Sequence, residues 1–328
     1  MKWIVIKQLA KNQDSALLTV ALILLIAALF KPTIGLKRDL HNYLFVVDVT
    51  QSMNTADMHS KDAYISRLAY TRLLMKDAVA QLPCGTNISL SVFSAESVAL
   101  LFTPIEVCKN YDVIQDSIAH LEWRMAWRGN SRLRFGMQSV TAILSSLPTP
   151  AQVVFFTDGD EAPKLNATNK TDLSGWQGGQ DWIIAGIGGD EPFPIPKLDS
   201  ENKVLGYWAY SNSIMAPSQV ISEDSVGTRD DSIATDDYNR YLSKLEDAYL
   251  QELAGEIGAK YIRANSTDSL INAMQAQKPA GYDTTRFAID GLLILAAMCL
   301  VLAQYRRNFI AKLKSYSSRY FVQNQELI

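Results

Sequence analysis

Short apolar runs that alternate with helical segments constrain the fold of this 328-residue chain more than any other feature. Residues 43–47 (YLFVV), 151–157 (AQVVFFT) and 181–187 (DWIIAGI) read as strands that are almost entirely apolar. Strands that are apolar on both faces lie in parallel sheets that helices cover on both sides. We therefore predict an α/β fold with a doubly wound, mostly parallel sheet.

Further segments between residues 63 and 275 complete this pattern. Hydrophobic spacing and capping residues predict helices over residues 63–82, 111–121, 133–147, 238–257 and 266–275. Additional strands are expected at residues 87–93, 98–102 and 259–262, the first two as a hairpin. Residues 188–235 are too long for an ordinary connection, so we interpret them as a functional or partner-specific insertion.

Two apolar segments flank the α/β stretch. Residues 15–30 carry no charge, and residues 287–305 carry only Asp290. A helix needs roughly 20 apolar residues to cross a bilayer core, so we predict transmembrane helices over residues 15–36 and 287–305. For the first segment the alternative is a cleaved signal peptide, although no clean small-x-small cleavage site follows Phe30.

Basic residues beside both segments predict their orientation. Lysines precede the first segment and arginines follow the second, so the positive-inside rule places residues 1–14 and the basic tail 306–328 in the cytoplasm. The main domain, residues 41–275, then lies outside. With a bacterial host assumed, we expect an inner-membrane protein whose main domain is periplasmic.

The three cysteines divide between the domain and the second apolar segment. Cys84 and Cys108 lie in the expected periplasmic domain, whereas Cys299 lies in the second segment. In an oxidising compartment Cys84 and Cys108 can form a disulfide. Two unpaired thiols are the alternative, because spacing alone does not bring two sulfur atoms within bonding reach.

Acidic residues follow two of the predicted strands. Asp48 is followed by Thr50 and Ser52, Asp158 ends the later strand, and Ser131 opens a helix between them. Ligands of doubly wound sheets bind at the carboxyl ends of strands. Carboxylate and hydroxyl oxygens suit a hard cation such as Mg²⁺, so we take these five residues as candidate metal ligands. For the first three residues a helix cap or turn is the alternative.

These motifs resemble the von Willebrand factor A domain, whose metal-ion-dependent adhesion site (MIDAS) reads D-x-S-x-S, then Thr, then Asp in a T-D-G turn. Residues 48–52 match the first element and residues 157–159 the third. In the middle element Ser131 stands where Thr is usual, and Arg134 stands where Gly is usual. The resemblance covers roughly residues 41–275.

The resemblance implies a bound Mg²⁺, or Ca²⁺ or Mn²⁺, that captures an acidic residue of a protein partner. An ion held mainly by neutral hydroxyls remains under-neutralised and can accept another carboxylate. Arg134 would place a positive charge close to the ion. Asp160 and Glu161 have no role in the family pattern, and we expect them in a solvated acidic turn.

The competing functional class is an enzyme. A hydrolase needs a nucleophile with a base, or two metals bridged by several acids. No histidine accompanies Ser52 or Ser131 in the sequence, and no Gly-x-Ser-x-Gly motif or phosphate loop is present. A pI of about 5.7 gives no basic bias towards nucleic acid. We therefore expect a binding module that is not an enzyme.

An A domain between two membrane anchors resembles two bacterial groups. One is the Bat-type aerotolerance proteins, which accompany MoxR-type AAA+ ATPases. The other is the MxaL/MxaC-type accessory proteins of methanol oxidation, to which residues 48–54 (DVTQSMN) are closer. This second resemblance implies a factor that acts with a MoxR-type ATPase and other accessory proteins of this domain type. Together they would insert Ca²⁺ into periplasmic methanol dehydrogenase. The Bat-type role is the alternative.

Overall fold

The structure is a computed structural model of the chain that describes all residues except 1, 61–62, 166–168, 177, 210–240 and 324–328. The chain forms two compact units. Residues 39–281 are one unit, and the stretches 1–38 and 282–328 are the other.

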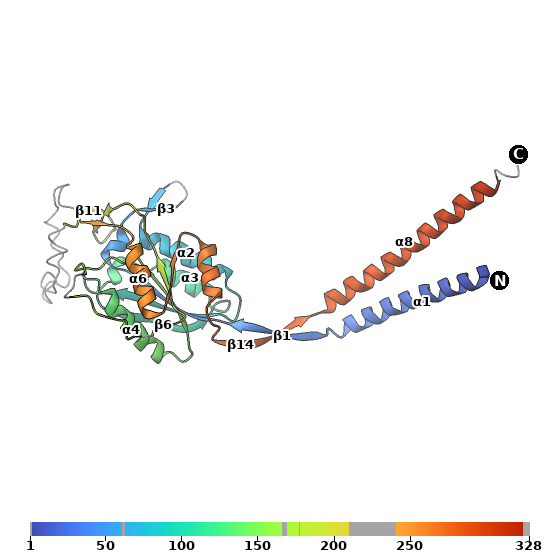
Figure 1. The fold of residues 1–328 in the computed structure, drawn as a ribbon, viewed down its shortest axis with the longest axis horizontal. Coiled ribbons are helices and arrows are strands. Elements are labelled where there is room, and N and C mark those ends of the chain that lie inside the picture. The colour runs from blue at the N-terminus through green and yellow to red at the C-terminus, as the bar shows by residue number, and fades with distance from the viewer. Residues whose placement is uncertain (1, 61–62, 166–168, 177, 210–240, 324–328) are drawn as a thin grey trace. The chain divides into compact units, whose positions relative to one another are not determined.

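A six-stranded sheet forms the centre of residues 39–281 (Figure 1). Its order is β13-β8-β7-β2-β5-β6, and all neighbours are parallel except the antiparallel pair β5–β6. This arrangement confirms the mostly parallel sheet and the predicted hairpin. The strands are β2 (Asn42–Asp48), β5 (Asn87–Ser94), β6 (Ser97–Glu106), β7 (Gln152–Thr157), β8 (Ile183–Gly186) and β13 (Lys260–Arg263).

Helices cover both faces of the sheet. Successive side chains of β2 point to opposite sides, so its apolar residues contact helices on each face. Phe45 and Val47 belong to a core cluster with α2 (Arg67–Gln81), α3 (Tyr111–Ala119) and α7 (Thr267–Gln275). Leu44 and Val46 belong to a second cluster with α4 (Leu133–Ser146) and α6 (Asp247–Ile257). The central strand is therefore buried on both faces, as its uninterrupted apolar sequence predicts.

Two of the predicted helices begin later than expected. Residues 63–65 form β4 (Ala63–Ile65), which pairs with β3 (Met58–Ser60), and Ser66 then caps α2 by accepting a 3.1 Å hydrogen bond from the Ala69 N–H. The helix expected from residue 238 begins instead at Asp247. Residues 238–240 lie outside the described residues, and β12 (Leu242–Ser243) precedes the helix.

The described part of the insertion consists of short strands. β9 (Phe193–Pro194) pairs with β12, and β10 (Pro196–Leu198) pairs with β11 (Val204–Tyr207), both antiparallel. The turn between β10 and β11 is anchored to the short helix η2 (Trp123–Met125), because the Trp123 indole N–H donates a 2.8 Å hydrogen bond to Asn202 Oδ1. The insertion thus contacts the segment that precedes Ser131.

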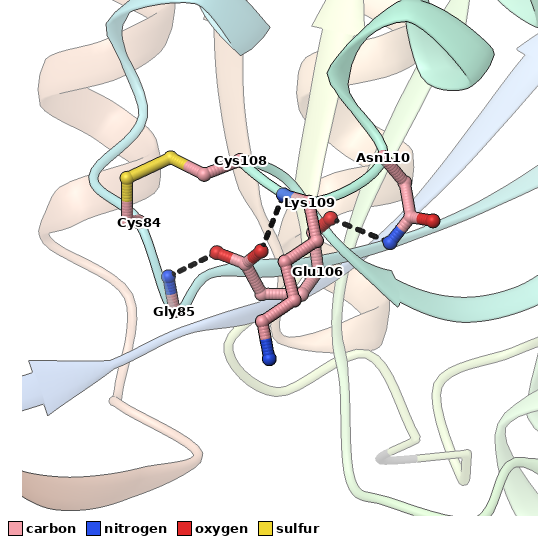
Figure 2. The surroundings of a disulfide bond; sticks show 6 residues. All are labelled: Cys84, Gly85, Glu106, Cys108, Lys109 and Asn110. Carbon is pink, nitrogen blue, oxygen red and sulfur yellow. Dashed lines mark hydrogen bonds between the residues drawn. A yellow bond between two sulfur atoms is a disulfide. The ribbon is translucent and has the colours of Figure 1, made fainter.

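A disulfide joins Cys84 and Cys108 and closes the open end of the β5–β6 hairpin (Figure 2). This bond confirms the pairing that the sequence left open. The Glu106 carboxylate lies beside it and accepts hydrogen bonds from the backbone N–H groups of Gly85 and Lys109. The two sulfur atoms are bonded to each other, so the disulfide and the hydrogen bonds of Glu106 together stabilise this edge of the sheet.

The second unit contains α1 (Lys2–Leu29) and α8 (Asp290–Gln323) with most of the strands β1 (Thr33–Leu40) and β14 (Gly281–Ala288), which pair with each other. Residues 33–36, predicted as the end of the first transmembrane helix, belong to β1, because α1 ends at Leu29. Among the described residues, no helix combines the length and the apolar character needed to cross a membrane.

Candidate metal site

The end of β2 arranges Asp48 and two hydroxyls in one tight turn. Asp48 is fully buried, and its Oδ1 accepts hydrogen bonds from the Thr50 N–H at 2.9 Å and the Thr50 hydroxyl at 2.6 Å. The Thr50 and Ser52 hydroxyl oxygens are 3.3 Å apart as the chain enters the short helix η1 (Gln51–Asn54). The alternating positions 48, 50 and 52 therefore place three oxygen-bearing side chains close together, as predicted.

The end of β7 lies beside the end of β2 because the two strands are parallel neighbours. The Thr157 hydroxyl donates a 2.7 Å hydrogen bond to Asp48 Oδ2 and so joins the two strand ends. Gly159 follows with a φ of +77°, and a Cβ there would lie 2.8 Å from Leu250 Cγ, so this turn requires glycine. The T-D-G sequence thus directs Asp158 into the protein, where it is fully buried.

Ser131 is held beside the same turn by two backbone hydrogen bonds. Its N–H donates to the Ala162 carbonyl at 3.0 Å, and the Ala162 N–H donates to the Ser131 carbonyl at 2.9 Å. Its hydroxyl is buried and has no hydrogen-bond partner among the residues that the structure describes. A buried hydroxyl without a partner is uncommon and requires an explanation.

A pocket of about 70 Å³ connects these side chains. Its polar lining includes Thr50, Ser52 and Ser131 together with Asp160, and its apolar lining includes the insertion residues Ile195 and Trp208. Neither Asp48 nor Asp158 lines the pocket. The structure therefore brings the three predicted hydroxyls to one cavity and leaves the two predicted carboxylates buried outside its lining.

The pKa values of the two buried carboxylates, Asp48 and Asp158, are both raised. Burial and the charge of Asp158 raise the pKa of Asp48 to about 7, against hydrogen bonds from Thr50 and Thr157 that favour the charged form. Burial also raises the pKa of Asp158, although Arg67 opposes that change. A divalent cation would favour the charged forms of both groups. Together with the unpartnered Ser131 hydroxyl and the all-oxygen donor set, these properties fit a hard cation such as Mg²⁺.

Arg67 is a residue of this site that the sequence did not predict. Its guanidinium is fully buried and lies 2.7 Å from Asp158 Oδ2 and 2.6 Å from Asp57 Oδ2. It also donates a 2.8 Å hydrogen bond to the Ser243 hydroxyl. Burial lowers the pKa of Arg67, but Asp158 and Asp57 outweigh it and raise the pKa. The partners lie 10, 91 and 176 positions away in sequence, so no local pattern indicates the cluster.

The prediction that Arg134 lies close to the metal is wrong. Arg134 stands in the first turn of α4 and faces α6, where its Nη2 is 2.6 Å from Glu256 Oε1. The buried guanidinium also donates to the Thr171 carbonyl. The position that the family pattern gives to glycine therefore serves here to join α4 to α6.

The prediction of a solvated turn at Asp160 and Glu161 is also wrong. Each residue is only 4% exposed. The Tyr241 hydroxyl donates to Asp160 Oδ1 at 2.8 Å, and the Tyr249 hydroxyl donates to Glu161 Oε1 at 2.6 Å. Burial raises the pKa of Glu161. The two tyrosines come from beyond the insertion, so their contacts could not be read from the acidic turn itself.

Residues 43–161 match the family model of the von Willebrand factor type A domain. Three curated proteins from Mycobacterium sp. strains KMS, JLS and MCS, each described as a UPF0353 protein, are 25% identical over 166 residues. The match covers 48% of this chain and 47% of each relative. The chain thus spans about half the length of the curated relatives it matches.

Two solved structures from Bacteroides are similar to this chain. An aerotolerance-related membrane protein from Bacteroides fragilis NCTC 9343 has a TM-score of 0.49 and 17% identity, over 72% of this chain and 98% of that chain. The conserved hypothetical protein BatB from Bacteroides thetaiotaomicron has a TM-score of 0.49 and 14% identity, over 72% of this chain and 97% of that chain. The matched residues 43–161 include both strand ends and the loop of Ser131, so the candidate site lies within the stretch that is similar to a von Willebrand factor type A domain.

Proposed function

We propose that this chain is a binding module that captures an acidic residue of a protein partner through a divalent cation at the ends of β2 and β7. The observation that carries the proposal is the buried Ser131 hydroxyl, which has no partner among the described residues and lines a pocket with the hydroxyls of Thr50 and Ser52. Mg²⁺ is the cation that such oxygens suit best, with Ca²⁺ or Mn²⁺ as alternatives.

The proposed ligand set is Asp48, Thr50, Ser52, Ser131 and Asp158. Asp48 orients the Thr50 hydroxyl directly through a 2.6 Å hydrogen bond. The three hydroxyls that line the pocket are neutral, so a bound cation keeps enough charge to attract a carboxylate from another molecule. Ile195 and the largely apolar ring system of Trp208 also line the pocket, and apolar groups strengthen electrostatic attraction by excluding water.

We further propose that the domain lies in the periplasm and is anchored in the bacterial inner membrane, with both termini in the cytoplasm. The Cys84–Cys108 disulfide supports an oxidising compartment. The apolar sequences of residues 15–30 and 287–305, with basic residues on their outer sides, support the two anchors. The anchored domain would present the proposed metal site to periplasmic partners.

The biological role that fits residues 48–54 best is that of a maturation factor. Such a factor acts with a MoxR-type ATPase and other proteins of this domain type to supply Ca²⁺ to periplasmic methanol dehydrogenase. A Bat-type aerotolerance role is the second candidate, because a von Willebrand factor A domain between two apolar segments fits it equally well. Both roles are non-enzymatic and use the same metal-dependent contact.

A comparative pull-down tests the metal-dependent contact. The full-length chain serves as bait in Mg²⁺, in EDTA, and in Mg²⁺ with the Asp48→Ala variant. We expect a partner in the first sample that is lost from the other two, because EDTA removes the cation and the variant loses the group that orients Thr50. The same partners in all three samples would contradict the proposal.

A further inference from the structure

Asp160 carries a buried carboxylate oxygen that nothing in the described structure satisfies. Its Oδ1 accepts a hydrogen bond from the Tyr241 hydroxyl and lies 2.8 Å from Lys164 Nζ. Its Oδ2 is buried and has no hydrogen-bond partner among the described residues. The carboxylate is therefore satisfied on one oxygen only, and leaving the other buried oxygen without a partner costs free energy. This oxygen thus indicates a place for a further ligand.

The unpartnered oxygen belongs to the same pocket as the hydroxyls of Thr50, Ser52 and Ser131. The backbone bridge between Ser131 and Ala162 explains this proximity, because it fixes the start of α4 against the segment that follows Asp160. Two buried oxygens without partners, Ser131 Oγ and Asp160 Oδ2, thus come from residues that line one cavity. One of them is anionic, and a small cation would satisfy both.

Asp158 is committed to other partners. Its Oδ2 lies 2.7 Å from Arg67 Nη1, and its Oδ1 accepts a 2.9 Å hydrogen bond from the Asp160 N–H. It does not line the pocket. A cation bound directly to Asp158 would have to share that carboxylate with a fully buried guanidinium, and two positive charges on one carboxylate repel each other. The positive charge beside Asp160 is that of Lys164, which is 46% exposed, so solvent screens its repulsion of a bound cation more strongly.

We propose that Asp160 is the charged ligand of the pocket cation, together with the hydroxyls of Thr50, Ser52 and Ser131. This inference rests on the metal-dependent function proposed above and changes the residue that supplies the charge. Asp158 then has a positioning role, because it holds Arg67 and the backbone N–H of Asp160 in place. Lys164, which is 46% exposed, competes with the cation for the Asp160 carboxylate.

A Mn²⁺ titration of the purified full-length chain, read by the electron paramagnetic resonance signal of free Mn²⁺, tests the assignment. We expect Asp160→Asn to weaken Mn²⁺ binding by at least about tenfold. Lys164→Met should instead strengthen binding by roughly two- to fivefold, because it removes a nearby positive charge. Asp158→Asn should weaken binding less than Asp160→Asn does, because the Asp158 carboxylate is held by Arg67 and lies outside the pocket lining.

Glu161→Gln is the matched control. Glu161 is adjacent to Asp160 and equally buried, but it does not line the pocket, so its replacement should leave the affinity unchanged. Circular dichroism and thermal unfolding establish that each variant is folded, and Ser131→Ala gives a second ligand variant that removes no hydrogen bond found in the structure.

Three outcomes overturn the assignment. If Asp160→Asn binds Mn²⁺ as tightly as the unaltered chain, Asp160 is not a ligand, and the proposed metal site stands without it. If Asp158→Asn loses the cation while Asp160→Asn keeps it, the T-D-G carboxylate is the charged ligand. If the unaltered chain binds no Mn²⁺, this inference and the proposed function fail together.

Discussion

Replacing Arg67 with methionine is expected to lower the free energy of unfolding by about 3–5 kcal/mol. Arg67 is a fully buried cation between the equally buried carboxylates of Asp57 and Asp158. Methionine retains much of the apolar volume and removes the charge. Two carboxylates then remain buried without their counter-ion, and this loss of the partner is the source of the large cost.

Urea denaturation followed by circular dichroism measures this loss. Arg263→Met is the control. Arg263 also pairs with an aspartate, but this partner, Asp190, is 74% exposed. An exposed pair of this kind contributes about 0.2–1 kcal/mol. Equal effects of the two substitutions, both below about 1 kcal/mol, would show that Arg67 is not a structural centre of the site.

Removing the Cys84–Cys108 disulfide with Cys84→Ala and Cys108→Ala together is expected to lower the free energy of unfolding by about 3.5 kcal/mol. The two cysteines are 24 positions apart in sequence, and the loop they close includes the whole β5–β6 hairpin. Without the bond, the unfolded chain regains the conformational freedom that the closed loop denies it. The sheet edge then depends on the strand pairing and on the Glu106 hydrogen bonds.

The same urea experiment compares this double variant with Cys299→Ala. Cys299 is the free, exposed cysteine of α8, so its replacement should change the free energy of unfolding by less than about 0.5 kcal/mol. Reducing agent should destabilise the unaltered chain and leave the double variant unaffected. Equal stability of the double variant and the unaltered chain would contradict the stabilising role of the disulfide.

The sheet could be predicted from the sequence because its evidence is local. Residues 43–47 and 152–157 are apolar on both faces, and this pattern alone indicates a buried parallel strand. Ser266 caps α7 as expected, since its side chain accepts a hydrogen bond from the Ser269 N–H. The predicted start of α6 was wrong, because the apolar residues Tyr241 and Leu245 extend the helical pattern towards the N-terminus. Both residues are buried, but they precede Asp247, where the helix begins.

The candidate metal site also combines residues that the sequence predicts with residues that only the tertiary structure brings together. Asp48, Thr50 and Ser52 were predictable because their contacts form within one turn. Asp160 was not, because its burial depends on Tyr241, which lies 81 positions later. The error at Arg134 arose because the family pattern gives the aligned position but not the direction in which α4 turns the side chain. Interactions between distant segments therefore decide which carboxylate reaches the pocket.

The most direct test of the central claim is a calorimetric titration of the full-length chain with Mg²⁺. The comparison is a variant that combines Thr50→Val, Ser52→Ala and Ser131→Ala and so lacks the three hydroxyls of the pocket. We expect the unaltered chain to bind one Mg²⁺ and the variant to show no saturable binding. A titration that is the same for both chains, or no binding to the unaltered chain, would contradict a metal site at the ends of β2 and β7.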